Sequence, residues 1–137
     1  MTDQKASEPL GQSPDTTVVV SRSVSQSVKD VWKTLVTPQG SEALLGPGGV
    51  LAIRGHTWQA EDGTYGVVRS FHPLEQIRFS WHAADEAPKT LVDLQLLSDG
   101  ANGTVLELRH EQIPDDADSD EIARRWEGAL AKLAEAS

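Results

Sequence analysis

Apolar side chains follow two different spacings along the chain. In several short runs every second residue is apolar, which is typical of a strand with one buried face. In longer runs they recur every three or four positions, as in an amphipathic helix. The clearest alternation lies at 76–81, where polar residues separate Ile77, Phe79 and Trp81. We predict strands over seven ranges: 17–24, 50–54, 56–60, 65–71, 76–81, 92–96 and 104–110.

The first helical stripe directly follows the first predicted strand. Ser27, with Asp30 three residues later, is a start signal for a helix. The Thr37-Pro38 step ends this helix, and 41–45 has the composition of a short second one. The stripe consists of Val28, Val31, Trp32 and Leu35.

The last part of the chain carries the strongest helical pattern. Asp118 is a good N-cap, and Glu121 and other acidic residues favour the positive end of the helix dipole. We therefore predict a long C-terminal helix. Its apolar stripe consists of Ile122, Trp126, Ala129, Leu130 and Leu133.

The order of these elements predicts an α+β fold with a largely antiparallel sheet. A strand is followed by one or two helices, five or six strands and the long helix; Asp62-Gly63 and 99–103 supply turns between strands. We expect one domain over 17–137, which is an ordinary domain size. Residues 1–16 contain almost no large apolar side chain, so we expect a disordered N-terminal tail.

Charge and composition exclude several classes of function. The net charge is −9, and residues 111–121 contain six acidic and no basic side chains, which disfavours binding to nucleic acid. The chain has no run of about 18 apolar residues, so we expect no membrane span. Cysteine is absent, and the first residues lack the features of a signal peptide. We therefore expect a cytoplasmic protein.

Catalytic and metal-binding signatures are missing from the sequence. The four histidines have no metal-ligand spacing, and no nucleophile, phosphate-binding or dinucleotide motif is present. Asp116 to Glu127 has some calcium-loop spacing, but Glu121 replaces the required glycine, so helix capping explains this segment better. We predict no catalytic residues, no metal and no cofactor. We also predict that His110 points inward with Leu106 and Leu108, as a structural hydrogen-bonding group.

Short motifs occur in a fixed order from Thr17 to the end of the chain. Together they resemble the helix-grip superfamily of START and polyketide cyclase/dehydrase domains, and more closely the homologues of the heat-shock-protein ATPase activator. The motifs are Val20-Ser21-Arg22-Ser23-Val24, Val31-Trp32 with Thr37-Pro38, Gly66-Val67-Val68 before Pro73, Ile77-Arg78-Phe79-Ser80-Trp81, Gly103-Thr104-Val105-Leu106 before His110 and Pro114, and Trp126 with Leu130 and Leu133.

The resemblance implies a helix-grip (START-like, Bet v-like) fold, in which a curved antiparallel sheet wraps around the C-terminal helix and encloses a cavity. Two positions depart from the pattern. Such relatives often carry tryptophan before the Gly-Pro at 46–47, where this chain has Leu44-Leu45, a change that reshapes the cavity mouth. They often have Gly-Trp in the last helix, where this chain has Arg125-Trp126; we expect Arg125 on an exposed face, with little effect.

We predict a binding protein for a hydrophobic small molecule, such as a lipid, a flavonoid or a polyketide-like aromatic, and not an enzyme. Apolar ligand sites usually have aromatic walls and few polar groups. The predicted walls are Trp58, Phe79, Trp81 and Trp126, with His110 as the polar anchor.

Two alternatives stay open. One is a chaperone-associated or stress-response module, in which 111–121 or the sheet surface meets a protein partner. The other is a polyketide cyclase-like enzyme that orients its substrate with Tyr65, Arg69 or His110.

Overall fold

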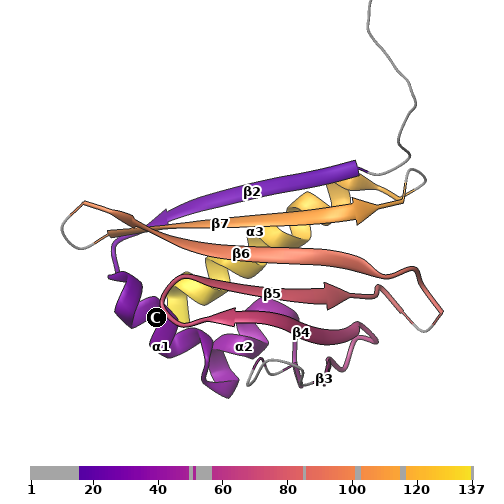
Figure 1. Cartoon of the computed structure of the whole chain (residues 1–137), viewed down its shortest axis with the longest axis horizontal. Helices are drawn as coiled ribbons and strands as arrows, with labels where there is room; N and C mark the ends of the chain where they lie inside the picture. Colours follow the sequence, from indigo (N-terminus) through magenta and orange to yellow (C-terminus); the bar gives the residue numbers. More distant parts are fainter. Residues whose placement is uncertain are drawn as a thin grey trace, which may run out of the picture.

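A sheet with helices packed on one of its faces forms the fold, as the computed structural model shows (Figure 1). The structure describes residues 16–49, 51, 57–84, 86–100, 103–114 and 117–136. Helix α3 crosses behind the sheet, and α1 and α2 lie together at one end (Figure 1). In chain order the elements are β2 (Thr16–Val24), α1 (Val28–Leu35), α2 (Pro38–Leu45), β3 (Thr57–Gln59), β4 (Tyr65–His72), β5 (Gln76–Trp81), β6 (Thr90–Asp99), β7 (Gly103–Ile113) and α3 (Ser119–Ala136).

The sheet has six antiparallel strands in the order β2-β7-β6-β5-β4-β3. Strands β3 to β7 therefore form a meander, in which each strand pairs with the next one along the chain. Strand β2, the first in the chain, pairs with the remaining free edge of β7. With the long C-terminal helix packed against this sheet, the predicted α+β, helix-grip architecture is confirmed.

Two irregularities interrupt the regular strand pairing of the sheet. Between Val18 and Thr16, β2 advances two residues while β7 advances three, so β7 carries one extra residue. Gln112 lies there with a left-handed φ of 65°. In a regular strand, residues three positions apart face opposite sides of the sheet. Because of this bulge, His110 and Ile113 are both buried. A second register shift lies between Val68 and Ser70 of β4.

Local signals fix both short helices. The Ser27 hydroxyl accepts a hydrogen bond from the backbone N–H of Asp30 (3.2 Å), so the predicted start of α1 is confirmed. Thr37 caps α2 in the same way, at Gly40 (3.2 Å), with Pro38 as the first helical residue. Helix α2 is thus three residues longer at its start than predicted, because Pro38 opens it as well as ending α1.

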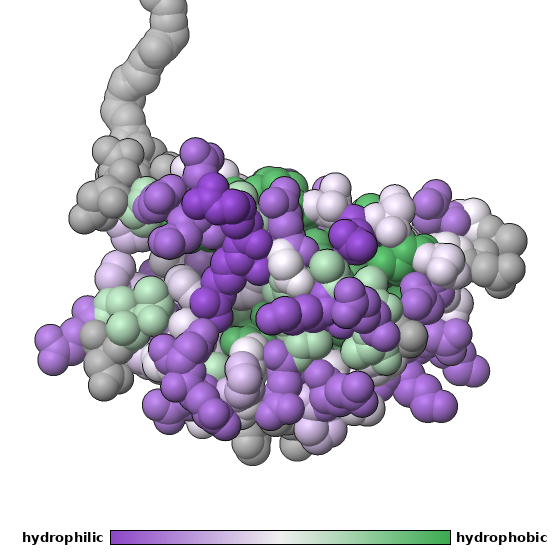
Figure 2. All heavy atoms as spheres, turned by 180° about the vertical axis from the view of Figure 1, so that it is seen from behind, coloured by the Kyte–Doolittle hydropathy of each residue, from purple (hydrophilic) through white to green (hydrophobic). Residues whose placement is uncertain are grey.

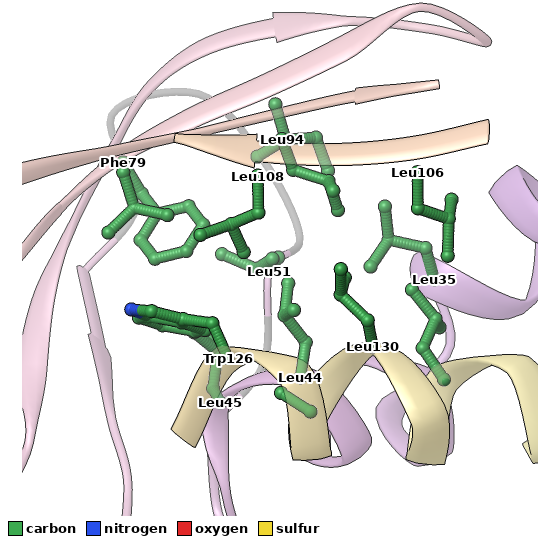
Figure 3. Packing of buried hydrophobic residues seen from close by; sticks show 14 of the residues in the cluster. Leu35, Leu44, Leu45, Leu51, Phe79, Leu94, Leu106, Leu108, Trp126 and Leu130 are labelled. Atoms are coloured by element: carbon green, nitrogen blue, oxygen red, sulfur yellow. The ribbon is translucent and has the colours of Figure 1, made fainter. Parts of the chain in front are cut away.

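The core lies between the sheet and the three helices of the described part of the chain. Figure 3 shows leucine and aromatic side chains from both layers pointing toward one another. Phe79 and Leu108 extend from the sheet toward Trp126 and Leu130 of α3. All four are at most 1% exposed, so their packing removes apolar surface from water and stabilises the fold. The predicted stripe of α3 is confirmed at Trp126, Ala129, Leu130 and Leu133, whereas Ile122 is only partly buried.

Strand boundaries differ from the prediction at several places. The predicted strand 56–60 is present as β3, and β6 and β7 extend beyond their predicted ends. The predicted strand 50–54 lies outside the described residues, apart from the fully buried Leu51. The predicted tail 1–16 also lies outside them, except for Thr16, the first residue of β2.

Candidate functional site

A cleft of about 960 Å³ lies between the start of α3, the end of β7 and the segment that joins β5 to β6. Its walls are mainly apolar, with Thr90 and His110 as buried polar groups and acidic side chains at the rim. Figure 2, seen from the side of α3, shows mostly hydrophilic side chains with hydrophobic ones between them. The cleft is lined by Thr64, Trp81, Ala83, Ala87, Pro88, Thr90, His110, Ile113, Pro114, Ala117, Asp118, Glu121, Ile122 and Arg125.

A chain of hydrogen bonds runs through the buried side of the cleft. The Trp126 indole Nε1–H donates to His110 Nδ1 at 2.9 Å, and His110 Nε2 lies 2.7 Å from Thr90 Oγ1. The Thr90 hydroxyl donates to the Trp81 carbonyl oxygen at 2.7 Å. Because an indole nitrogen can only donate, Nδ1 is the acceptor and the neutral ring carries its proton on Nε2. Both ring nitrogens of His110 therefore have protein partners.

This environment keeps His110 neutral. Burial, together with the smaller effect of the nearby positive charge of Arg125, lowers its pKa from 6.5 to about 4. The Trp126 N–H acts in the same sense, since a proton on Nδ1 would face another donor. The inward orientation and structural hydrogen bonding expected of His110 are therefore present.

Arg125 lies against the aromatic wall of the cleft. Its guanidinium carbon is 5.3 Å from the centre of the Trp81 ring and 5.8 Å from that of Trp126. Its Nη2 donates to Asp62 Oδ2 at 3.0 Å and, at 3.4 Å, to the Leu45 carbonyl oxygen. The expectation that Arg125 lies on an exposed face is wrong, whereas the expected small effect of this position stays a prediction. The β3–β4 turn brings Asp62 to α3, and the side chain is only 34% exposed.

Asp62 itself is held from two directions. Its Oδ1 accepts hydrogen bonds from the backbone N–H and the hydroxyl of Thr64, at 3.0 and 2.7 Å. Partial burial alone would raise the pKa of Asp62, but the bonds from Thr64 and Arg125 outweigh it and the pKa is lowered. The carboxylate therefore stays charged beside Arg125.

The five predicted site residues lie in one aromatic cluster, but at different depths. Trp81 and His110 line the cleft. Trp126 packs edge-on to both, at ring-centre distances of 5.9 and 5.8 Å, and Phe79 and Trp58 lie behind it in the core. Trp58, Phe79 and Trp126 are thus structural support for the cleft and not part of its lining.

Several lining residues carried no recognisable signal in the sequence. Thr90 precedes the alternating part of β6, and Arg125 is one residue from an apolar position of α3. Tyr65 and Arg69, considered for a cyclase-like site, do not line this cleft: Tyr65 stacks on His82 at 4.3 Å, and Arg69 is exposed.

Metal-ligand geometry is lacking in the described residues, which contain no group of three or more His, Asp or Glu side chains that could hold an ion. Asp115 and Asp116 of the calcium-like segment lie outside them. Asp118 accepts a hydrogen bond from the backbone N–H of Glu121 at 3.1 Å, which confirms its predicted role as a helix cap.

The fold and the cleft define a helix-grip protein with an opening between sheet and C-terminal helix. Residues 24–137 match the family described as Activator of Hsp90 ATPase homolog 1-like protein. The chain belongs to this family, as its sequence motifs indicated. No curated protein matches the chain.

Solved structures share the fold at low sequence identity. CalU16 from Micromonospora echinospora is 24% identical with a TM-score of 0.73, covering 86% of this chain and 71% of its own. The Aha1 dimer from Colwellia psychrerythraea is 18% identical with a TM-score of 0.72, covering 88% of this chain and 95% of its own. DynU16, a putative protein in the dynemicin biosynthetic locus, is 23% identical with a TM-score of 0.71, covering 87% of this chain and 46% of its own.

The described helices include none that is both long and apolar enough to cross a membrane.

Proposed function

We propose that this protein binds an apolar or amphipathic small molecule in the cleft between α3 and the sheet. The observation that carries the proposal is the cleft itself, whose volume of about 960 Å³ suits a drug-sized ligand. The indole of Trp81 and the side chains of Ile113 and Ile122 supply apolar walls, and apolar surface makes up the larger part of the lining. This combination is characteristic of ligand sites that bind by burial of apolar surface.

The hydrogen bonding around His110 favours binding over catalysis. A general base needs a free lone pair at the substrate, and the acceptor nitrogen of this ring already receives the Trp126 N–H. The other nitrogen is committed to Thr90. We therefore propose a binding role without a chemical step, with no need for a cofactor.

A screen of fatty acids, flavonoids and polyketide-like aromatics tests the proposal by thermal shift and by NMR of the indole N–H signals. We expect a ligand at about 100 times its Kd to raise the free energy of unfolding by about 2.7 kcal/mol. The Trp81 indole signal should shift most, because this ring lines the cleft.

Two neighbouring alanines provide a matched pair of variants. Ala83 lines the cleft and Ala84 does not, although both are exposed. Ala83→Trp should reduce binding by filling the mouth of the cleft, whereas Ala84→Trp should bind as the wild type does. A library without any hit, or equal binding by both variants, contradicts the proposal. In the first case a protein partner at the same face becomes the better hypothesis.

A further inference from the structure

Arg125 is the basic side chain of the cleft lining, and its neighbours leave part of it free to bind a ligand. A guanidinium has five N–H donors arranged as a planar fork. Among the described residues, both hydrogen bonds of Arg125 leave from Nη2, to Asp62 and Leu45. Nε and Nη1 thus retain their donors.

The position of Arg125 suits an anchor for a head group. The faces of Trp81 and Trp126 hold the guanidinium at the border between the apolar walls and the solvent. An apolar ligand body beside Trp81 would bring its polar end next to this fork. His110 is less suited to this task, because both of its nitrogens have partners.

Charges near Arg125 limit which head groups fit. Asp118 and Glu121 are exposed at the rim, and Asp62 already shares Nη2. Exposed charges interact weakly through high-dielectric solvent, and the pair of Arg125 with Asp62, whose side chains are 34% and 42% exposed, is weak, so these carboxylates reduce the positive potential at Arg125 without cancelling it. A single carboxylate on one of the free donors of Arg125 is therefore favourable, whereas a phosphate or dicarboxylate would place more negative charge among three acidic side chains.

We infer that the ligand is an amphipathic monocarboxylate, with its apolar body against Trp81 and one carboxylate oxygen on a free N–H of Arg125, at Nε or Nη1. This inference rests on the proposed function and names its ligand class. It makes Arg125 the specificity-determining residue of the cleft. A charge-assisted hydrogen bond is the interaction that would separate a carboxylate from a neutral compound of the same shape.

Matched ligand pairs test this inference: 2-naphthoate against 2-naphthylmethanol, and decanoate against 1-decanol. Calorimetry gives Kd, and the Trp81 indole signal reports whether each compound occupies the cleft. In the wild type we expect each carboxylate to bind about ten-fold or more tighter than its alcohol. Arg125→Gln should abolish this preference while leaving alcohol binding within about two-fold, and Arg125→Lys should restore only part of it.

Arg124→Gln is the matched charge control, because Arg124 is exposed and does not line the cleft. It should keep the full carboxylate preference. Asp62→Asn should strengthen carboxylate binding, since it removes the anion that shares the guanidinium. Equal binding of carboxylate and alcohol in the cleft overturns this inference alone. A preference lost equally in the Arg124 variant overturns it as well, and binding of neither class in the cleft overturns the proposed function too.

Discussion

His110 combines complete burial with complete hydrogen bonding, which makes it a fixed polar support for the cleft. The ring accepts from Trp126 and donates to Thr90, so it ties α3 to β6 from its place on β7. A charged ring would lose the first of these bonds and face the cation of Arg125. Protonation of this one residue is therefore coupled to the stability of the whole fold.

We expect the free energy of unfolding to fall by about 2 kcal/mol between pH 7 and pH 5 because of His110. The pKa of His110 is about 4 in the folded protein, against 6.5 for an ordinary histidine. Between these values the unfolded chain binds a proton that the folded chain does not. Stability is thus full above the unfolded pKa and is lost as the pH falls from about 6.5 toward 4. Urea unfolding at several pH values measures it.

Two histidine variants separate the contribution of His110 to the pH dependence of stability from the contribution of the acidic residues. His110→Gln should remove this part of the pH dependence, whereas His72→Gln, at an exposed position of β4, should retain it. Trp126→Phe removes the N–H that occupies Nδ1, so it should raise the pKa of His110, measurable by NMR. An unchanged pH dependence in His110→Gln would contradict the assignment.

Residue-scale features were predictable from the sequence only where they follow from local periodicity. His110 follows Leu106 and Leu108 at every second position of a strand, which predicts an inward side chain. The helical stripe of the last segment likewise predicts Trp126 in the core. The contact of Arg125 with Asp62 joins residues 63 positions apart, through a turn whose approach to α3 no local pattern encodes. For the same reason the sequence does not identify Thr90 as the partner of His110.

At the scale of elements, close approach between strands explains one position that periodicity does not. Strand β4 passes so near to β5 that a Cβ on Gly66 would lie 1.8 Å from the Ser80 carbonyl oxygen. It would also lie 2.9 Å from Nε1 of Trp58, on β3. Position 66 therefore requires glycine.

We expect Gly66→Ala to destabilise the protein by more than about 2 kcal/mol, because the backbone of β4 or β5 must move to admit the methyl group. Gly128→Ala is the matched control. Gly128 is exposed on α3 with nothing near its added Cβ, so alanine should stabilise the helix by about 0.5–1 kcal/mol. Urea denaturation gives both values, and equal effects would refute the close packing of β4 against β5.

At the scale of the whole molecule, the fold was predictable because element order and local signals agree. Alternating strands, capped helices and a C-terminal stripe all point to one arrangement, and the family match covers 24–137. The cleft was less predictable because segments distant in sequence form it: the β5–β6 connection, the end of β7 and the start of α3. Periodicity identifies inward side chains, but it does not distinguish those that line a space from those that fill it. Trp81 lines the cleft, whereas Phe79, two residues before it on the same strand face, is fully buried in the core.

The two ends of α3 are held differently, and this asymmetry predicts where a ligand acts. Near its C-terminus, the Ala134 carbonyl accepts a hydrogen bond from the Gln26 side chain at 3.1 Å, and Ala129, Leu130 and Leu133 are buried in the core. Its first turns border the cleft, where partly exposed Arg125 supplies the link to Asp62. Local opening is easiest where few buried contacts hold an element. We therefore expect amide exchange in the free protein to be faster over residues 119–125 than over 129–133.

Saturation with a ligand from the screen should slow exchange most over residues 119–125 and 86–90, the two walls that it bridges. Stabilisation by mass action also slows exchange everywhere that opens by global unfolding, so the β2–β7 pair serves as the internal reference. In the wild type, exchange at the cleft walls should slow more than exchange in the β2–β7 pair. In Ala83→Trp at the same ligand concentration, the two should slow equally. Hydrogen-exchange mass spectrometry resolves these segments. Uniform slowing along the chain would place the ligand elsewhere and contradict binding between α3 and the β5–β6 connection.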